Sequence, residues 1–274
     1  MNSHHFIRSG GRDVVTHHRE GLIMRIVVIG GTGRIGSKVV QDLTEQGHDV
    51  VAAAPSTGVN TLTGEGLRNV MTGVQAVVDV SNSPTLDDAA IEFFQAATTN
   101  VLTAEADAGV GHHVTLSVVG TDRLAPHSGY FQAKLLQEKL ISESSIPYSI
   151  VRATQFFEFL DIIADSATVD GVVHLPPALI QPMAAIDVAE AVAIATVGEP
   201  VNGIREVGGP EAFRMPDLIR TALTARGDSR EVVADPAAQY WGISIAERDL
   251  VPDDGATLFG THFEDWVLRA AAKA

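Results

Sequence analysis

Residues 24–36 read MRIVVIGGTGRIG, an apolar stretch that runs directly into a glycine-rich turn. The β-branched residues before the turn are typical of a buried strand, and residues 37–43 after it have the apolar spacing of a helix that ends near Gly47. A glycine-rich turn between a strand and a helix lets a pyrophosphate approach the backbone, and the helix start adds free N–H groups and a positive dipole. This junction is therefore predicted to bind a dinucleotide.

The glycines satisfy two spacings, Gly-x-Gly-x-x-Gly counted from Gly31 and Gly-x-x-Gly-x-x-Gly counted from Gly30. In either case one glycine permits the tight turn, one admits the pyrophosphate and the last lets the helix touch the sheet. An ordinary tight turn is the alternative interpretation. The predicted cofactor-binding residues of the loop are Gly30, Thr32, Gly33, Arg34, Ile35 and Gly36.

The end of the second predicted strand bears on the choice of cofactor. A site that prefers NAD has an acidic side chain there, about 20 residues after the glycines, to hold the ribose 2′-hydroxyl. This strand ends at Ala54, and its only acid, Asp49, lies at its start. Arg34 with Ser56 and Thr57 could instead bind a 2′-phosphate. We therefore predict NADP(H), with the alternative that Arg34 is solvated and NAD(H) also binds.

The composition restricts the partners. The chain has 274 residues, 34 of them acidic against 19 basic, and a net charge of −15. Without a cluster of Lys and Arg, this charge argues against nucleic acid and an anionic membrane, and no apolar run is long enough to span a bilayer. The absence of cysteine excludes disulfides and Cys-ligated metals and fits a cytoplasmic location. We predict a small-molecule substrate and no metal site, and a homo-oligomer is compatible with the sequence.

Predicted strands alternate with predicted helices, which indicates a parallel sheet. The strands are residues 76–80, 114–119 and 148–152, the helices are residues 64–71, 86–108, 130–142 and 187–197, and residues 58–60 are an abbreviated third strand. The predicted fold class is α/β, a Rossmann-type doubly wound parallel sheet with a small C-terminal substrate-binding lobe. Ligands bind such sheets at the carboxyl ends of the strands, where the glycine loop, Ser81, Asn82 and Ser117 should converge.

The domain organisation follows from this order. Residues 1–23 are polar, contain two pairs of histidines and are predicted to be a disordered extension. Residues 24–150 form the dinucleotide-binding part. Residues 151–274 supply the remaining strands and the substrate-binding lobe within one integrated domain.

Tyr130 and Lys134 lie four residues apart on a predicted helix, so both side chains point the same way. A nearby cation stabilises a phenolate and lowers the pKa of the phenol, which prepares Tyr130 to exchange a proton with a carbonyl oxygen. Lys134 would also reach the nicotinamide ribose, and Ser117, at the end of its strand, could hydrogen-bond the substrate oxygen. A surface pair of Tyr and Lys is the alternative interpretation.

The glycine run, residues 116–120 (LSVVG) and residues 130–134 (YFQAK) together resemble the atypical short-chain dehydrogenase/reductases, including the NmrA-like and NAD(P)H-binding groups. The resemblance extends over about residues 24–200. It implies that Ser117 orients the substrate, that Tyr130 is the general acid/base, and that Lys134 binds the ribose and tunes Tyr130. The asparagine of the family's catalytic set would fall near Ala96 and is missing, while Asn100, one turn away, is expected to face solvent.

The resemblance implies an NAD(P)H-dependent oxidoreductase that transfers hydride to a carbonyl or quinone-like small molecule. The alternative is a non-catalytic, NmrA-like redox sensor that binds the dinucleotide and reports its oxidation state. Sugar-nucleotide epimerisation ranks last, because the C-terminal part has no evident basic cluster for a diphosphate. Apolar residues that suggest a hydrophobic pocket, or alternatively the core, are Phe156, Phe157, Phe159, Leu175, Pro176 and Met183. The aromatic residues expected in the core of the C-terminal part are Trp241, Phe259, Phe263 and Trp266.

Overall fold

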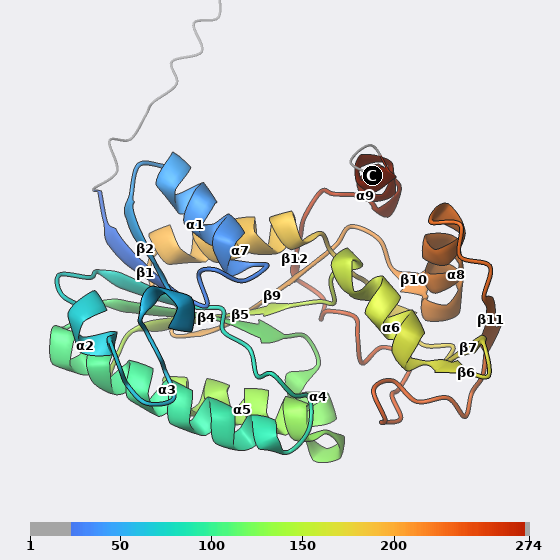
Figure 1. The fold of residues 1–274 in the computed structure, drawn as a ribbon, viewed down its shortest axis with the longest axis horizontal. Coiled ribbons are helices and arrows are strands. Elements are labelled where there is room, and N and C mark those ends of the chain that lie inside the picture. Colours follow the sequence, from blue (N-terminus) through green and yellow to red (C-terminus); the bar gives the residue numbers. More distant parts are fainter. Residues whose placement is uncertain (1–22, 272–274) are drawn as a thin grey trace, which may run out of the picture.

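The computed structural model describes residues 23–271, so the predicted extension lies outside the described residues except for its last residue. Its centre is a seven-stranded parallel sheet with the order β12-β9-β5-β4-β3-β1-β2 (Figure 1). The strands are β1 (Arg25–Ile29), β2 (Asp49–Ala53), β3 (Ala76–Asp79), β4 (His112–Val118), β5 (Tyr148–Ala153), β9 (Gly203–Gly208) and β12 (Thr257–Leu258). The chain passes from β1 outward to β2 and then returns to the other side of β1 at β3. This is the predicted Rossmann-type, doubly wound arrangement.

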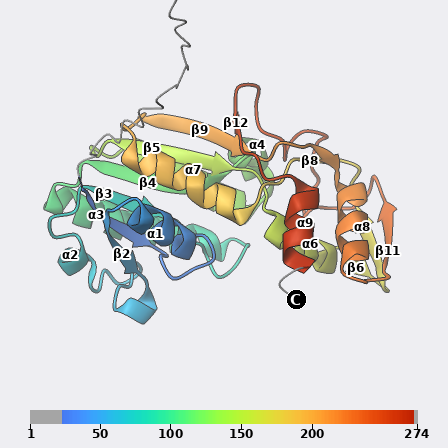
Figure 2. The ribbon, with the colours of Figure 1, turned by 90° about the horizontal axis from the view of Figure 1, so that it is seen from above.

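Helices cover both faces of the sheet (Figures 1 and 2). The helices on one face are α1 (Gly36–Glu45) and α7 (Ala185–Val197), and those on the other are α2 (Leu67–Val70), α3 (Ala89–Ala108) and α5 (Gly129–Ser142). Because successive strand residues point to opposite faces, Ile26 and Val28 of β1 pack under α1 and α7, while Val27 and Ile29 pack under α2 and α3. All four are buried, as in a sheet covered on both sides.

The predicted third strand, residues 58–60, does not form. Residues Pro55–Thr57 make a 3₁₀ turn, η1, that ends at Gly58 in a left-handed conformation with φ of +84°. The chain is therefore turned away from the sheet, and Asn60 pairs only with Glu65 in an isolated bridge. As a result β2 is an edge strand, and the segment after it runs past the carboxyl ends of the sheet.

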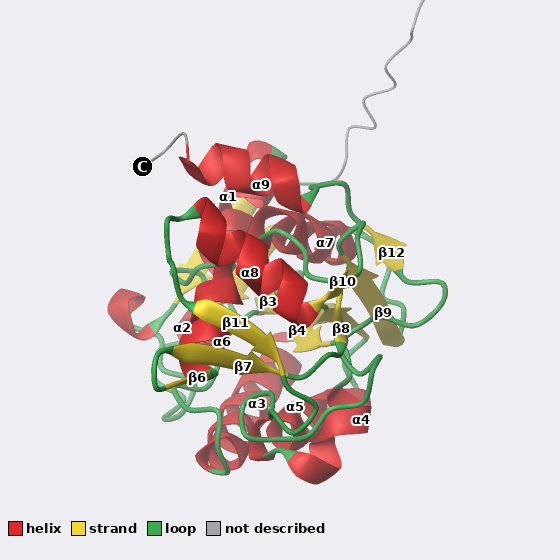
Figure 3. Ribbon diagram, turned by 90° about the vertical axis from the view of Figure 1, so that its right-hand side faces the viewer, coloured by secondary structure: helices red, strands yellow, loops and turns green. Residues whose placement is uncertain are grey.

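The C-terminal part adds a small lobe beside these carboxyl ends (Figure 3). Its elements are α6 (Leu160–Ser166), β6 (Thr168–Val169), β7 (Val172–Leu175), β8 (Leu179–Ile180), β10 (Phe213–Arg214), α8 (Met215–Ala225), β11 (Glu231–Ala234) and α9 (Phe263–Ala271). The short connecting helices are α4 (Thr121–Leu124), η2 (Ala125–His127) and η3 (Phe157–Phe159). The core of the lobe includes Leu160 and Leu218 and continues to Phe131 of α5, so the lobe packs directly on the Rossmann part. Within residues 23–271, no helix is both long and apolar enough to cross a membrane.

Candidate active site

A cavity of about 800 Å³ opens at the carboxyl ends of β1, β3, β4 and β5. Doubly wound sheets bind their ligands at this place, where the chain turns back across the first strand. The predicted site residues that line the cavity are Gly30, Thr32, Gly33, Arg34, Ile35, Gly36, Ser81, Asn82, Ser117, Tyr130 and Lys134. The fold thus brings together every predicted site residue except Ser56 and Thr57.

The glycine loop fits the Gly-x-x-Gly-x-x-Gly spacing counted from Gly30, and Gly31 is required as well, since a Cβ there would lie 2.7 Å from the Val28 carbonyl oxygen. Gly30 has a φ of +76°, a left-handed conformation that other residues rarely adopt. A Cβ on Gly36 would collide with the carbonyl group of Gly30, so this glycine lets α1 pack on the loop. A Cβ on Gly33 would meet only the Gly30 carbonyl oxygen, at 3.2 Å, because Gly33 faces the open cavity. The three positions match the turn, packing and ligand roles of a dinucleotide-binding loop.

Two further observations fit a bound dinucleotide. The first turn of α1 contains no acidic residue, so the positive end of this helix is available to an anion without a competing carboxylate. In addition, Ser81 Oγ, Thr154 Oγ1 and both amide atoms of Gln155 are buried without a partner among the described residues. All three residues line the cavity. Because buried polar groups are normally hydrogen-bonded, these groups indicate a polar ligand.

Ser56 and Thr57 lie beside the cavity and do not line it. Thr57 Oγ1 accepts a hydrogen bond from the Ala54 N–H at 2.9 Å and lies 3.0 Å from the carbonyl oxygens of Ala52 and Ala54, so this hydroxyl closes the η1 turn. The segment that lines the cavity instead is Asn60, Thr61 and Leu62. The predicted contribution of Ser56 and Thr57 to phosphate binding therefore has no direct geometric support.

Asn100 holds this lining segment in place. Its amide Nδ2 donates to the carbonyl oxygens of Thr61 and Leu62 at 2.8 and 3.1 Å. The expectation that Asn100 faces solvent is therefore wrong. Its partners lie 38 and 39 residues earlier in the chain, so its helical position alone did not indicate the contact.

Arg34 is the charged residue of the glycine loop, and it lines the cavity. Its side chain is exposed, its guanidinium carbon lies 5.7 Å from the ring centroid of Phe159, and it forms no ion pair with any described residue. Asp49 is bound to Arg25 at 2.6 Å, at the opposite end of β2 from the cavity. No Asp or Glu among the described residues lines the cavity. A 2′-phosphate would therefore meet a cation and no carboxylate.

Tyr130 lies in the first turn of α5 and points across to the loop after β3. Its hydroxyl donates to Asn82 Oδ1 at 3.1 Å. The ring contacts those of Phe94 and Phe131 edge to face, with centroids 6.5 and 5.7 Å away. Burial, and then the neighbouring Tyr240 hydroxyl, raise the pKa of Tyr130, whereas the hydrogen bond to Asn82 lowers it. The predicted lowering of this pKa by Lys134 is not observed, and the phenol keeps its proton at neutral pH.

Lys134 is a buried residue in the cavity wall, and its Nζ is held against the end of β4. Its Nζ donates to the Leu116 carbonyl oxygen at 2.9 Å and to Gln137 Oε1, and lies 4.6 Å from the ring centroid of Phe94. Burial lowers the pKa of Lys134 to about 8, while the carboxylates of Asp79 and Glu138 act in the opposite direction. Gln137 Nε2 in turn donates to Asp79 Oδ2 at 3.1 Å. Sequence reasoning missed this supporting chain, because its members come from two distant elements.

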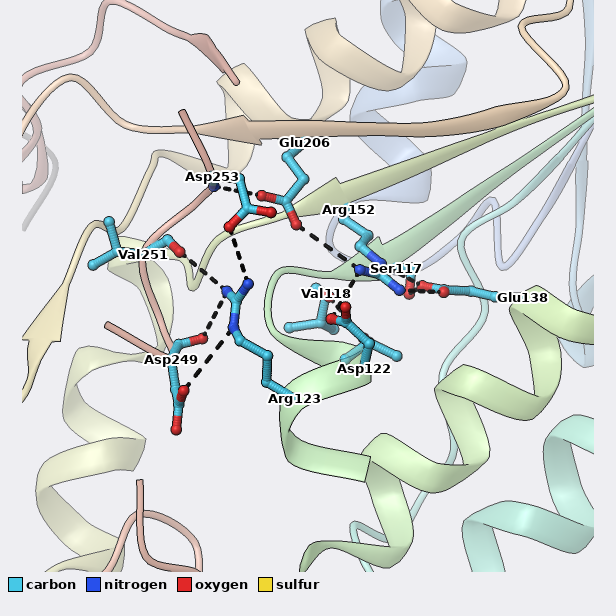
Figure 4. Close-up of polar contacts among 11 residues, drawn as sticks. Ser117, Val118, Asp122, Arg123, Glu138, Arg152, Glu206, Asp249, Val251 and Asp253 are labelled. Carbon is cyan, nitrogen blue, oxygen red and sulfur yellow. Dashed lines mark hydrogen bonds and ion pairs between the residues drawn. The ribbon is translucent and has the colours of Figure 1, made fainter. Parts of the chain in front are cut away.

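Ser117 faces a buried ion pair (Figure 4). Its hydroxyl donates to Glu138 Oε1 at 2.5 Å, and the guanidinium of Arg152 binds both oxygens of that carboxylate, at 2.9 and 2.7 Å. Arg152 also binds Asp122 at 3.0 Å. These hydrogen bonds raise the pKa of the Arg152 guanidinium against the opposing effect of its burial. Because its proton is donated to Glu138, Ser117 presents acceptor lone pairs rather than a donor to the cavity.

A second group of contacts in Figure 4 ties α4 to the C-terminal lobe. The guanidinium of Arg123 donates to the carbonyl oxygens of Asp249 and Val251 at 3.3 and 3.2 Å and to the Asp253 carboxylate at 3.1 Å. These contacts fasten the segment that follows residues 240–243 to α4. Residues 240–243 themselves contribute Tyr240, Trp241 and Ile243 to the cavity wall.

The apolar candidates divide between cavity and core. Phe156 and Phe159 line the cavity, whereas Phe157, Leu175 and Met183 are fully buried core residues. Trp241 lines the cavity, which corrects the expectation that it belongs to the core, while Phe263 and Trp266 do pack in the core of the lobe. Among the described residues, no group of three or more His, Asp or Glu side chains is placed to hold a metal.

This fold and loop define a Rossmann-type dinucleotide-binding protein. Residues 30–194, more than half of the chain, match the model of the NAD(P)H-binding family. The chain belongs to that family.

Two curated relatives are similar in sequence. The chain is 26% identical over 152 residues to the photosystem II assembly factor Ycf39 of Synechocystis, a match that covers 50% of this chain and 46% of that protein. It is 29% identical over 206 residues to the (4-alkanoyl-5-oxo-2,5-dihydrofuran-3-yl)methyl phosphate reductase of Streptomyces griseus, with 69% of each chain covered. The two relatives are thus named as an assembly factor and as a reductase.

Solved structures share the fold. The dTDP-4-dehydrorhamnose reductase of Bacillus anthracis in complex with NADP superposes with a TM-score of 0.66 at 15% identity, covering 93% of this chain and 99% of that one. The UDP-glucose 4-epimerase of Thermus thermophilus in complex with NAD gives a TM-score of 0.64 at 19% identity, covering 83% and 92%. These similarities show the Rossmann-type fold.

Proposed function

We propose that the protein is an NADP(H)-dependent reductase of the short-chain dehydrogenase/reductase type, with a carbonyl or quinone-like small molecule as its substrate. The observation that carries this proposal is the position of Tyr130 in the wall of the dinucleotide cavity, where its hydroxyl donates to Asn82 Oδ1 at 3.1 Å. When bound, the reduced nicotinamide supplies the hydride. The glycine loop, the start of α1 and the unpartnered groups of Ser81 and Gln155 would hold the dinucleotide.

Tyr130 supplies the proton in this proposal. As the carbonyl carbon accepts a hydride, its oxygen gains negative charge, and the Tyr130 hydroxyl donates its proton to that oxygen. The phenol carries its proton before the reaction, as an unperturbed tyrosine also does, and burial, which raises the pKa of Tyr130, makes it a weaker acid until the bound cofactor and substrate change its surroundings. Asn82, through its hydrogen bond to the hydroxyl, holds the phenol toward the cavity.

Lys134 and Ser117 take supporting roles. Lys134 lines the same cavity one helical turn after Tyr130 and is proposed to bind the nicotinamide ribose. Ser117 is proposed to orient the bound molecules as a hydrogen-bond acceptor, because its own proton is held by Glu138. The predicted role of Ser117 as a donor to the substrate oxygen is thereby replaced by an acceptor role.

The preference for NADP(H) rests on charge. Arg34 is exposed at the cavity and free of ion pairs with described residues, and the described lining residues include no carboxylate. A guanidinium binds a phosphate through charge-assisted hydrogen bonds, and a carboxylate would repel it. NAD(H) is expected to bind through the same glycine loop with lower affinity.

A redox sensor that binds the dinucleotide without turnover is the second candidate. One observation favours it: Lys134 is hydrogen-bonded to the Leu116 carbonyl and Gln137 rather than to the phenol, so the phenol is not activated by the cation. In addition, one relative is named as an assembly factor, so similarity to this chain does not by itself imply a reductase.

The oxidation of NADPH in the presence of quinones, aldehydes and ketones tests the two candidates. We expect Tyr130→Phe to lower kcat by about 100-fold or more, since general acid catalysis contributes 10²–10⁴-fold, and to leave the Kd of NADPH nearly unchanged. Tyr148→Phe, at the start of β5 and outside the cavity, is the matched control. Full turnover by Tyr130→Phe would contradict the catalytic role, and tight NADPH binding without reduction of any acceptor would favour the sensor.

A further inference from the structure

The tight turn at residues 240–243 is unusual in its sequence. Tyr240 and Ile243 form a reciprocal pair of backbone hydrogen bonds, N–H to O distances of 2.8 and 3.1 Å, around a two-residue loop. Both loop residues have positive φ, +49° for Trp241 and +80° for Gly242. Two-residue loops of this kind favour Asn-Gly or Gly-Gly, because a side chain with a Cβ is strained there.

Packing within the protein, which includes an edge-to-face contact with Tyr240, accounts for only part of the choice of Trp241. The side chain is 38% exposed and lies at the tip of the turn, so burial compensates for only part of the backbone strain. Instead, the indole lines the same cavity as Tyr130. A strained residue at a ligand cavity indicates that the side chain serves the ligand rather than the fold.

The charge of the cavity narrows the ligand class. Of the described residues that line it, only Arg34 and Lys134 carry a charged side chain. The proposed function assigns both to the dinucleotide, to its 2′-phosphate and its nicotinamide ribose. No cation then remains for a second phosphate, so a sugar nucleotide, with its diphosphate, would be desolvated without compensation. The lining therefore favours an uncharged substrate over an anionic one.

The aromatic residues in the wall of the cavity narrow the class of substrate further. Beyond Tyr130 the cavity is bordered by the aromatic side chains Phe93, Phe131, Phe159, Tyr240 and Trp241. The planes of Tyr240 and Trp241 meet at 79°, with centroids 6.2 Å apart, so the two rings form a corner. Aromatic faces favour flat rings, which can stack on one wall and meet the other edge to face.

The rings of Tyr240 and Trp241 stand nearly perpendicular, and the cavity offers no further cation. The geometry points to Trp241 as a specificity-determining residue that stacks on the ring of a flat, uncharged substrate such as a polycyclic quinone. This inference rests on the proposed reductase function for its turnover readout only. The binding readout below is independent of catalysis.

Binding is measured by the emission of Trp241. The chain has two tryptophans, and the second, Trp266, stacks on Phe263 in the lobe core and does not line the cavity. In Trp266→Phe, Trp241 is therefore the sole tryptophan, and excitation selective for tryptophan over tyrosine reports on it alone. With NADP⁺ bound, so that no hydride is available, titration with 9,10-phenanthrenequinone is expected to quench this emission to saturation. In Trp241→Phe, which keeps only Trp266, the same titration should lower the tryptophan emission slightly and without saturation.

Turnover is measured with phenanthrenequinone and with butane-2,3-dione, a small acyclic dicarbonyl. Trp241→Asn removes the ring and places a residue that tolerates positive φ. We expect the ratio of kcat/KM for phenanthrenequinone to that for butane-2,3-dione to fall by about tenfold or more, which corresponds to the loss of one stacking surface. Trp241→Phe should keep most of the ratio, and the thermal midpoint of Trp241→Asn should not fall.

The outcomes separate the two proposals. Saturable quenching without reduction of any acceptor would support the ligand class and contradict the reductase. Reduction that depends on Tyr130, with no saturable quenching and an unchanged substrate ratio in Trp241→Asn, would overturn the role of Trp241 and leave the reductase intact. Displacement of the quinone by UDP-glucose, or a large loss of thermal stability in Trp241→Asn, would also overturn it.

Discussion

The hydroxyl of Ser117 donates to Glu138 Oε1 at 2.5 Å, and the same carboxylate is held through both of its oxygens by Arg152. Ser117 lies at the carboxyl end of β4, where a serine is expected to donate to the substrate. In this protein a buried carboxylate accepts that proton. Ser117 is consequently part of the support of the site and can offer only lone pairs to a ligand.

Ser117→Ala tests this arrangement. The loss of an oxyanion donor lowers kcat by about 10²–10³-fold, whereas an acceptor in a supporting position costs much less. We expect kcat/KM to fall by less than about tenfold and the free energy of unfolding to fall by about 2 kcal/mol, as for a hydrogen bond to a charged group. Steady-state kinetics and urea unfolding measure the two quantities. A loss of kcat above about 100-fold with unchanged stability would restore the donor role.

The ion pair behind Ser117 predicts a large effect on stability. The side chains of Arg152 and Glu138 are 8% and 5% exposed, so Arg152→Met leaves a buried carboxylate without its partner. We expect the free energy of unfolding to fall by about 3–5 kcal/mol in urea. The matched control is Arg25→Met, which breaks the exposed Arg25–Asp49 pair and should cost no more than about 1 kcal/mol.

A double variant tests whether the unpaired charge of Glu138 causes the loss of stability in Arg152→Met. Arg152→Met with Glu138→Leu removes both charges and should recover most of the loss, since apolar replacement of a buried pair is often neutral. If the double variant is as unstable as Arg152→Met alone, the loss comes from packing or from the contacts of Arg152 with Asp122 and Glu206.

The regular part of the fold was predictable from local sequence. The apolar run of β1 and the turn after it set both the first crossover and the position of the cavity, and the Tyr130–Lys134 spacing placed both residues on one helix. The missing third strand was not predicted, because Pro55 and the left-handed Gly58 turn the chain where apolar content alone suggested a short strand. Turn residues here outweigh the strand pattern.

The supporting contacts of the site could not be predicted in the same way. Glu138 and Arg152 come from a helix and a strand, and Asn100 reaches a loop 39 residues earlier, so no sequence period links these partners. The orientation of Lys134 toward the Leu116 carbonyl depends on the buried Asp79 and Gln137 around it. The sequence predicts Trp241 in the core, because aromatic residues usually lie there, and its place in the cavity wall depends on a turn whose contacts no sequence period indicates.

Lys134 predicts a stability change at alkaline pH. Burial lowers its pKa from 10.5 to about 8 in the folded protein, so between these values the unfolded chain binds the proton more tightly. Stability therefore rises with pH in this window, because the folded protein is relieved of a buried charge that destabilises it at pH 7. Relative to Lys134→Met, the wild type should gain about 3 kcal/mol between pH 7 and pH 10.5.

Urea unfolding of the wild type and Lys134→Met across this range measures the difference, in which other titrating groups cancel. Lys139→Met, an exposed lysine on the same helix, is the control and should show no such trend. A constant difference between wild type and Lys134→Met would mean that the ammonium of Lys134 is fully compensated by its neighbours and keeps an ordinary pKa.

Arg34 predicts the selectivity between the two dinucleotides. If its guanidinium binds the 2′-phosphate, Arg34→Gln removes one charge-assisted contact that NADPH makes and NADH does not. We expect the Kd of NADPH to rise by about 10–100-fold and that of NADH to change little. Arg68→Gln, an exposed arginine on α2 outside the cavity, is the control. Equal weakening of both dinucleotides would place Arg34 at the pyrophosphate, and no change in either would mean that the guanidinium stays with Phe159 and solvent.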